Sequence, residues 1–408
     1  MASEELAWLH ALREYPDQFA LHGDARSFYE RALDSRPFFA AHLREPLWPF
    51  LIRPLLSGDE NRDTYRIRTF TGIINVFLVA AIGCLAWRLG GPLAGGFAAA
   101  LFSGSSLTSY YGISGLREPL MSLLLVTLTT LWTYRRNWLV TLGIIGVTGM
   151  VPLLRLDGLL VVTLVLPVCA IWVRDKSAAS VAMTACLFAW GVTAPYLTNL
   201  RRECGSAFAP LHQHARYWRN HEFAGQPGHL TREEVLANAY GGAPVTPWQY
   251  VFGERTLAAT AGRYLHGFWL ALTDYVPRLL DERWWIWFWP VGVVWALWHW
   301  RQAGIVVPVG LLAQLPFAFI LPLNMVTSHG LWRGVEARFA WPLSPFVAVW
   351  AGLGFAAILH PLLRSAQQRW SSKRGQPQLN SPKDSAKNPS SATGPRAKAC
   401  PLDEIPPL

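Results

Sequence analysis

Apolar segments long enough to cross a lipid bilayer recur along this chain between residues 69 and 360. A spanning helix must satisfy its backbone hydrogen bonds internally. Hydrophobic residues make up 52% of the 408 positions and charged residues only 15%, which excludes an ordinary soluble domain. The sequence therefore predicts an all-α polytopic membrane protein with about nine transmembrane helices. We place them at 69–88, 92–110, 118–134, 138–154, 158–173, 178–198, 284–299, 304–323 and 339–360.

The basic residues between these segments set the predicted orientation. Cytoplasmic loops collect Lys and Arg. Because successive loops lie on alternate sides of the membrane, one orientation of the chain satisfies that rule. Its inward-facing residues are Arg88, Arg135, Arg136, Arg174, Lys176, Arg301 and the basic residues of the C-terminal tail. Four arginines then face outward, namely Arg117, Arg155, Arg333 and Arg338. Because a cation at the membrane boundary needs a partner, we expect an anionic ligand on the outer side.

Composition divides the chain into three parts. Residues 1–66 are polar and form a predicted outer-face N-terminal segment. Residues 67–362 form the transmembrane domain, whose outer loop 199–283 contains an amphipathic stretch at 257–272 that is expected to lie along the membrane. Residues 363–408 are rich in Ser, Pro, Lys and Gln, which predicts a disordered cytoplasmic tail.

The opening segment does not resemble a signal peptide. Glu4, Glu5, Arg13 and Asp17 lie where an uncharged core would be required. Two explanations stay open. Either the N-terminal segment is translocated behind the first helix, or a further spanning helix precedes the sequence given. We favour the second explanation.

Five motif-bearing segments flank apolar runs on the predicted outer side. They are LHGDARSFYERALD (21–34), REPLWPFLIRPL (44–55), SGLREPL (114–120), PLLRLDGLL (152–160) and GLWRGVEARFAWPLSP (330–345). Each motif alone is weak, but their order and their common side make the set moderately specific.

Together these segments resemble the GT-C membrane glycosyltransferases of the mannosyltransferase and aminoarabinose-transferase kind, over residues 20–360. The shared traits include an acidic first outer loop (Gly23, Asp24 and Ala25, then Phe28 or Tyr29, and Ala32), an R-x-D-G junction (155–158) and a late Arg-aromatic-x-x-Pro helix start (338–342). The resemblance implies a sugar donor carried on a polyprenyl phosphate. A helix expected before the acidic loop is missing from the sequence.

Asp24 is the predicted catalytic residue. Sugar transfer from a phosphate-linked lipid needs a base for the acceptor hydroxyl and cations for the departing phosphate. A partly desolvated carboxylate near the membrane surface would have a raised pKa suited to a base. The alternative is that Asp24 only caps the helix that begins near Ala25.

Arginines are the predicted phosphate-binding residues, because a guanidinium recognises phosphate with two hydrogen bonds. We expect Arg155 and Arg338 to hold the donor phosphate, with support from Arg117 or Arg333. An internal ion pair is the alternative for Arg117, and snorkelling from a helix end is the alternative for Arg338. The predicted supporting residues are Tyr29, Glu118, Asp157 and Glu336.

Four histidines, His212, His214, His221 and His229, lie in the outer loop. Their spacing does not complete a convincing ligand set, so we favour a structural or acceptor-contact role over zinc. We assign no metal ligand and no certain cofactor. A divalent cation stays an open alternative, because some GT-C members use one.

The predicted function is an inverting hexosyl- or pentosyltransferase that acts on the non-cytoplasmic face. Its partners would be a polyprenyl-phosphate sugar, a lipid, glycan or protein acceptor, and membrane lipids. The net charge of +10 is explained by topology and anionic lipid, not by nucleic acid. A bacterial inner membrane is favoured. The alternatives are a transporter or flippase for an anionic lipid-linked substrate, and a non-catalytic scaffold.

Overall fold

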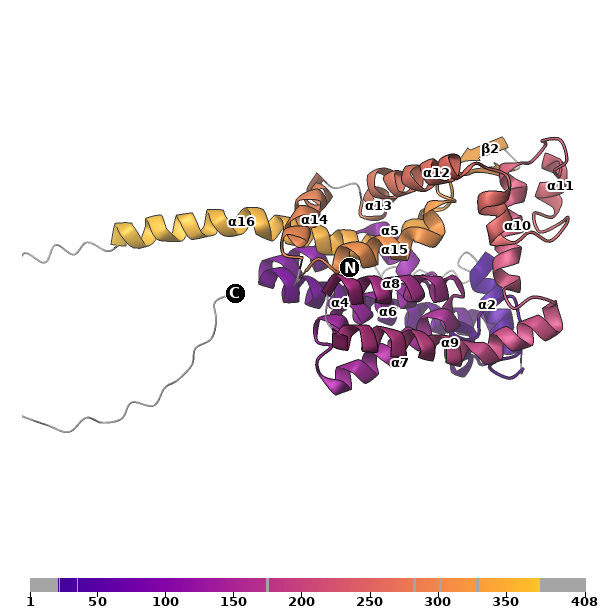
Figure 1. Cartoon of the computed structure of the whole chain (residues 1–408), viewed down its shortest axis with the longest axis horizontal. Helices are drawn as coiled ribbons and strands as arrows, with labels where there is room; N and C mark the ends of the chain where they lie inside the picture. The colour runs from indigo at the N-terminus through magenta and orange to yellow at the C-terminus, as the bar shows by residue number, and fades with distance from the viewer. Residues whose placement is uncertain are drawn as a thin grey trace, which may run out of the picture. The chain divides into compact units, whose positions relative to one another are not determined.

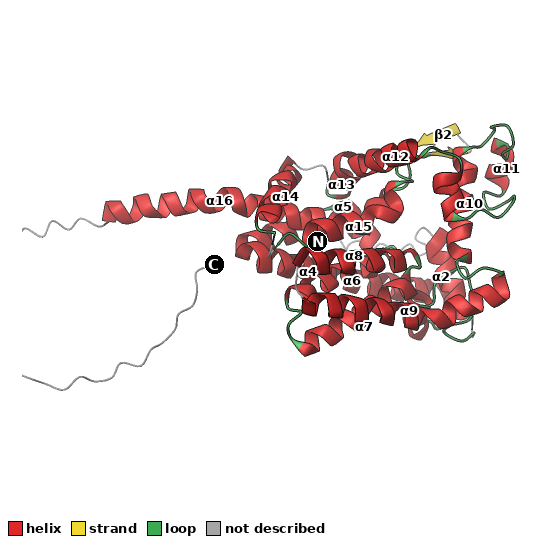
Figure 2. Ribbon diagram, viewed as in Figure 1, coloured by secondary structure: helices red, strands yellow, loops and turns green. Residues whose placement is uncertain are grey.

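The computed structural model describes residues 21, 23–34, 36–173, 176–281, 284–300, 303–327 and 330–374. In these ranges the chain is almost entirely helical, as the sequence predicts (Figure 2). The only strands found there are β1 (Asn324–Thr327) and β2 (Gly330–Arg333), which pair antiparallel with Asn324 opposite Arg333.

The first half of the chain builds a bundle. Helices α4, α6, α7, α8 and α9 pack side by side, and the shorter α2 lies near one end of this bundle (Figure 1). Helix α3 packs against α2 and α7. The elements are α2 (Gly23–Leu33), α3 (Leu47–Ile52), η2 (Arg53–Leu55), α4 (Glu60–Ser103), α5 (Ser106–Gly112), α6 (Glu118–Thr133), α7 (Trp138–Leu154), α8 (Asp157–Val173) and α9 (Lys176–Cys204).

The second half adds shorter elements. Helix α15 packs against α8 of the bundle and against α12. The elements are α10 (Ala209–Glu222), α11 (Arg232–Ala237), the π-helix η3 (Gln249–Gly253), α12 (Leu257–Leu270), the π-helix η4 (Ala271–Tyr275), α13 (Val276–Leu279), η5 (Trp284–Phe288), α14 (Trp289–Trp298), α15 (Val306–Ala318), η6 (Ala337–Ala340) and α16 (Ser344–Arg374).

Local sequence signals explain several helix boundaries. The Asp59 side chain accepts hydrogen bonds from two first-turn N–H groups and caps α4. Within α4, Gly91 has a φ of 82° and precedes Pro92, so the helix breaks there and its two limbs pack against each other, with Gly95 close to the Gly83 carbonyl. The predicted division between 69–88 and 92–110 falls at this break. The second of these segments is itself interrupted at Ser105, which caps α5.

Three described helices are long and apolar enough to cross a membrane by length and composition, namely α4, α9 and the Ser344–Leu362 part of α16. Five other predicted spans form shorter apolar helices, at Glu118–Thr133, Trp138–Leu154, Asp157–Ile171, Trp284–Trp298 and Val306–Ala318. These findings support an integral membrane protein. The count of nine spans stays a prediction.

The described part of the predicted tail begins as helix. Helix α16 extends to Arg374, past the predicted tail boundary at residue 363. The disordered tail stays a prediction. The remainder of the tail and residues 1–20 lie outside the described residues. The chain divides into two compact units, Met1–Pro361 and Leu362–Leu408, and the core and the cavity described below belong to the first.

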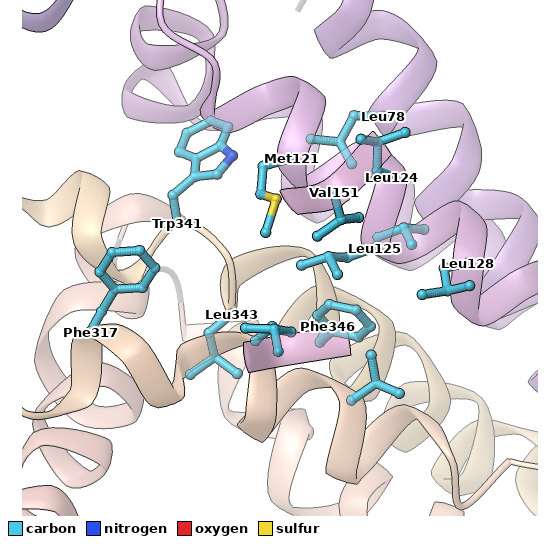
Figure 3. Packing of buried hydrophobic residues seen from close by; sticks show 14 of the residues in the cluster. Leu78, Met121, Leu124, Leu125, Leu128, Val151, Phe317, Trp341, Leu343 and Phe346 are labelled. Atoms are coloured by element: carbon cyan, nitrogen blue, oxygen red, sulfur yellow. The ribbon is translucent and has the colours of Figure 1, made fainter. Parts of the chain in front are cut away.

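A single large apolar cluster joins the bundle to α15 and α16. Figure 3 shows part of it, with Leu124 and Leu125 of α6, Val151 of α7 and Phe346 of α16 among its buried side chains. Within a bilayer such side chains leave lipid and not water, so they stabilise the bundle through close van der Waals packing. The cluster thereby fixes the α6–α8 ends that carry the polar residues described below.

One close helix contact gives a stability prediction. A Cβ added at Gly267 of α12 would lie 1.6 Å from the carbonyl oxygen of Ala318 in α15, so this glycine is required by backbone contact. We expect Gly267→Ala to destabilise the protein by about 1–3 kcal/mol or more. Gly262→Ala on the same helix meets nothing within 4 Å and is expected to stabilise α12 by up to about 1 kcal/mol. Thermal unfolding in mild detergent compares them, and equal stability of the two variants would contradict the packing.

Candidate active site

A cavity of about 1250 Å³ lies where α2 and the starts of α6 and α8 meet the segment after β2. Seven of the nine predicted site residues line it, although they come from four separate parts of the sequence: Asp24, Arg117, Glu118, Arg155, Asp157, Glu336 and Arg338. The walls are otherwise rich in aromatic and aliphatic side chains, including Tyr217, Trp218, Tyr264 and Phe317. A large apolar cavity with a few convergent charged groups is typical of a ligand site.

Asp24 lies in the first turn of α2 and contacts two arginines. Its Oδ1 accepts a hydrogen bond of 2.6 Å from Arg44 Nη2, and its Oδ2 lies 3.0 Å from Arg338 Nη1. Arg44 is held in place by a second hydrogen bond of 3.0 Å, from its Nε to Ser27 Oγ. The carboxylate of Asp24 therefore connects α2 to the segment that carries Arg44 and to the segment after β2 that carries Arg338. All three side chains line the cavity.

The expected raised pKa of Asp24 is wrong. Burial alone would raise the pKa of this carboxyl, but the positive charges of Arg338 and Arg44 outweigh burial and hold the pKa well below its ordinary value. Asp24 is thus ionised at neutral pH and, with both arginines in contact, is a weak base. Sequence reasoning missed this because it did not predict that Arg338 and Arg44 both contact Asp24.

Arg155 lies between α7 and α8 and makes a two-point contact with Asp157. Its Nε donates to Asp157 Oδ1 at 3.0 Å and its Nη2 donates to Oδ2 at 2.9 Å. Its Nη1 lies 3.6 Å from Glu118 Oε1, and the guanidinium carbon is 4.5 Å from the centre of the Phe317 ring. Two hydrogen bonds and an aromatic face fix the orientation of this buried cation.

Arg117 forms a deeply buried ion pair with Glu45, a residue that sequence reasoning did not assign to the site. Arg117 Nη1 donates to Glu45 Oε2 and also, at 2.8 Å, to the Leu154 carbonyl. Glu45 Oε1 accepts the Leu156 N–H at 3.0 Å. The two side chains are only 5% and 3% exposed, which makes this pair unfavourable to open. It ties the segment before α3 to the start of α6 and to the α7–α8 turn.

Arg338 is less enclosed. Besides Asp24 it contacts Glu336, whose Oε2 lies 2.6 Å from Arg338 Nε and whose side chain is 62% exposed. Each of the three arginines with described side chains therefore has a carboxylate partner within the protein. For Arg117 this is the internal ion pair that the sequence left open as the alternative. Arg338 is the one with the most accessible partners.

Two predicted site residues are placed elsewhere. Tyr29 is buried on the opposite side of α2, where its hydroxyl lies 3.4 Å from Asp63 Oδ2, so it supports the α2–α4 contact and does not line the cavity. A helix turns by about 100° per residue, so Tyr29, five residues after Asp24, points about 140° away from Asp24 around the helix axis. Arg333 lies in β2 opposite Asn324, and its side chain lies outside the described structure.

His214 of α10 lines the cavity, whereas His212 does not. Residues two apart on a helix point in different directions, which separates the H-x-H pair. Burial lowers the pKa of His214 to about 4 against the attraction of Glu45, so its imidazole is neutral at pH 7. No three His, Cys, Asp or Glu side chains in the described ranges are grouped to hold a metal ion. The divalent cation stays an untested alternative.

No family model matches the sequence, and no curated protein matches it. ArnT from Cupriavidus metallidurans bound to undecaprenyl phosphate aligns with a TM-score of 0.51 and 13% identity, over 93% of this chain and 65% of that one. The archaeal oligosaccharyltransferase AglB from Archaeoglobus fulgidus, in complex with an inhibitory peptide and a dolichol-phosphate, aligns with a TM-score of 0.51 and 13% identity, over 89% of this chain and 49% of that one.

The chain shares its helical fold with ArnT and AglB. At 13% identity the similarity concerns the fold, and this chain spans less than two thirds of the length of either protein. The fold expectation drawn from the motif order is thus confirmed for the helical architecture. The roles of the residues that line the cavity are not established by these alignments.

The buried Glu45 predicts a pH dependence of stability. Burial alone would raise the pKa of Glu45, but Arg117 and the Leu156 N–H lower it from 4.5 to about 2. A lowered pKa stabilises the fold above the ordinary value of 4.5, and that contribution, on the order of 3 kcal/mol, is lost as pH falls toward 2. Chemical unfolding in detergent should show a free energy that declines between pH 4.5 and 3. Glu45→Gln should be less stable at pH 7 and show a smaller decline, and an unchanged slope would exclude Glu45 as its source.

Proposed function

We propose that this GT-C chain transfers a sugar from a polyprenyl-phosphate-linked donor to an acceptor hydroxyl. The observation that supports it is the convergence of Asp24, Arg155 and Arg338 on one large cavity with an apolar wall. The ionic wall suits a phosphate and a sugar, and the aromatic wall suits the first units of an isoprenoid chain. The undecaprenyl phosphate and the dolichol-phosphate bound in the ArnT and AglB structures are consistent with this choice.

Arg338 and Arg155 are the proposed phosphate ligands. Arg338 pairs with carboxylates that are 31% and 62% exposed, so an incoming phosphate can exchange with them at low cost. Arg155 keeps Asp157 as its fixed partner and offers its remaining N–H groups on Nη1. Arg117, paired deep inside the protein, is proposed to hold the α6 and α8 starts in place and not to contact the donor. Arg333 stays a proposed supporting residue.

Donor binding would also prepare the base. When the phosphate takes Arg338 from Asp24, the carboxylate loses one of the two arginines in contact with it, and the one that lowers its pKa most. Its basicity then rises. The acceptor oxygen then attacks the anomeric carbon as its proton passes to Asp24. The bond from that carbon to the phosphate oxygen breaks, and the polyprenyl phosphate leaves with the electron pair. A direct displacement of this kind inverts the anomeric centre.

The site is proposed to lie on the outer face of a bacterial inner membrane. The four predicted outer arginines are at helix starts and ends that meet near one cavity or in the adjoining β2 strand, which agrees with a common side. Hexosyl or pentosyl donors and lipid, glycan or protein acceptors all fit this proposal.

The transferase proposal is tested by product formation. Purified protein in mild detergent is incubated with bacterial lipid extract and a cell-envelope acceptor fraction, and mass spectrometry follows release of free polyprenyl phosphate. We expect release that depends on the acceptor fraction and that is absent in Asp24→Asn. Acceptor-independent movement of intact donor across liposomes, without release, would instead indicate a transporter and would overturn the proposal.

A further inference from the structure

The segment that carries Arg338 follows the β1–β2 hairpin, and one buried side chain connects the two ends of this hairpin. The Tyr275 hydroxyl donates to the Leu321 carbonyl at 3.1 Å and accepts from the Val335 N–H at 3.0 Å. Leu321 lies three residues before β1, and Val335 lies two residues after β2. One phenol group therefore holds together the two segments that enter and leave the hairpin.

The hydroxyl of Tyr275 is needed for this arrangement. Tyr275 is only 5% exposed, and both hydrogen bonds of its hydroxyl are buried. A phenol has one proton to donate, and here that proton goes to a backbone carbonyl while the oxygen receives a backbone N–H. Without the hydroxyl, both backbone groups would be buried without these partners, which is unfavourable.

The backbone that presents Tyr275 is widened into the π-helix η4. The Val276 N–H donates to the Ala271 carbonyl, five residues earlier, whereas an α-helix uses the carbonyl four residues earlier. The π-helix ends at Tyr275, where the chain passes directly into α13. π-helical turns occur frequently at functional sites, and both Asp274 and Tyr275 of this turn line the large cavity.

Gly334 fits against Tyr275 only because it lacks a side chain. Its φ of 85° lies in the left-handed region, which other residues rarely adopt. An added Cβ would also overlap the Tyr275 hydroxyl oxygen. The contact between the hydroxyl and the start of the segment after β2 thus leaves no space for another residue at this position.

Two side-chain hydrogen bonds hold the backbone on either side of Arg338. Tyr275 holds Val335, three residues before Arg338. Gln314 of α15 is buried and donates from Nε2 to the carbonyl of Phe339, the residue after Arg338, at 3.0 Å. Because only two residues separate Val335 from Arg338, a shift of the Val335 peptide would displace the guanidinium.

We infer that Tyr275 is a positioning residue of the donor site. Its hydroxyl fixes the segment after β2 so that Arg338 contacts Asp24 in the free protein and can reach a donor phosphate. Tyr275 acts through the backbone and through Arg338, and it takes no part in proton transfer. Its role toward the donor rests on the proposed transferase function, whereas its hold on the segment does not.

Amide hydrogen exchange tests the hold on the segment. The purified full chain is measured in mild detergent without added lipid. Tyr275→Phe keeps the ring and removes the hydroxyl, so exchange in peptides that cover residues 334–340 is expected to rise about tenfold. Tyr264→Phe is the matched control, because Tyr264 lines the same cavity and its hydroxyl makes no hydrogen bond in the described structure. Unchanged exchange in Tyr275→Phe would overturn the inference.

A double-mutant cycle tests whether the hydroxyl acts through Arg338. Native mass spectrometry gives the affinity for undecaprenyl phosphate. Tyr275→Phe should weaken binding about tenfold when Arg338 is present and should have no further effect in the Arg338→Ala background. Equal weakening in both backgrounds would also overturn the inference, because the hydroxyl would then act independently of Arg338.

The two measurements distinguish this inference from the transferase proposal. A wild-type chain that binds no undecaprenyl phosphate would contradict the proposed donor site, and the exchange measurement would still decide whether Tyr275 fixes the segment. Gly334→Ala displaces the same hydroxyl from the other side of the contact. If Tyr275→Phe does not fold by size-exclusion chromatography, Gly334→Ala is expected to give the same rise in exchange and the same dependence on Arg338.

Discussion

Asp24→Asn is expected to lower the rate of sugar transfer by about 10²–10⁴-fold, the range typical of losing a general base. Asparagine keeps the size of the side chain but cannot accept the proton of the acceptor hydroxyl. Donor binding should persist or tighten, because the amide releases Arg338 from its ion pair with Asp24. The measurement is single-turnover transfer with donor already bound, which separates chemistry from binding.

Glu30→Gln is the matched control for Asp24→Asn. Glu30 lies on the same helix α2, its side chain is 60% exposed and its partner is Arg26 at 3.0 Å, so the variant should transfer normally. The pH profile adds a second check. Because its pKa is held low in the free protein, Asp24 should produce no acid limb in kcat/KM between about pH 5 and 8. Normal transfer by Asp24→Asn would remove Asp24 from the role of base.

Arg155→Lys is expected to weaken polyprenyl-phosphate binding by about 10- to 100-fold, although the charge is kept. Lysine cannot hold Asp157 at two points and offer further N–H groups to a phosphate at the same time, and the loss of a charged hydrogen bond is about 1.5–3 kcal/mol. Native mass spectrometry with undecaprenyl phosphate gives the affinity.

Arg278→Lys provides the matched control for Arg155→Lys. Arg278 also lines the large cavity, but its side chain is 56% exposed and it pairs with Asp274 at 2.6 Å. Its conversion to lysine should leave the affinity for undecaprenyl phosphate close to wild type. Equal losses in both variants would show that any lining arginine affects binding, and would contradict a specific role for Arg155.

Much of the site could be predicted because its residues occur in short motifs at helix starts. Arg155 and Asp157 are separated by one residue between two apolar segments, so the sequence alone indicated that they lie near a membrane boundary and near each other. Glu118 and Pro119 were expected in the first turn of a helix, and they begin α6. The motif order also predicted the helical fold shared with ArnT and AglB.

The remaining features depend on contacts between distant segments. Glu45 stands in a proline-rich stretch that gives no sign of burial, and only the fold places Arg117 beside it, 72 residues later in the chain. The pKa of Asp24 depends in the same way on Arg44 and Arg338, which come from two other segments. Hydropathy located the division between 69–88 and 92–110 but not the interruption at Ser105, because a side chain that caps a new helix leaves the hydropathy unchanged.

The most direct test of the account is lipid mass spectrometry on the purified Asp24→Asn protein in mild detergent, beside an Arg155→Ala/Arg338→Ala variant. The account predicts that a polyprenyl-phosphate sugar remains bound to the first protein and is lost from the second, and the bound mass would identify the sugar. If both proteins are folded and neither carries such a lipid, or both carry it equally, the proposed donor site is wrong.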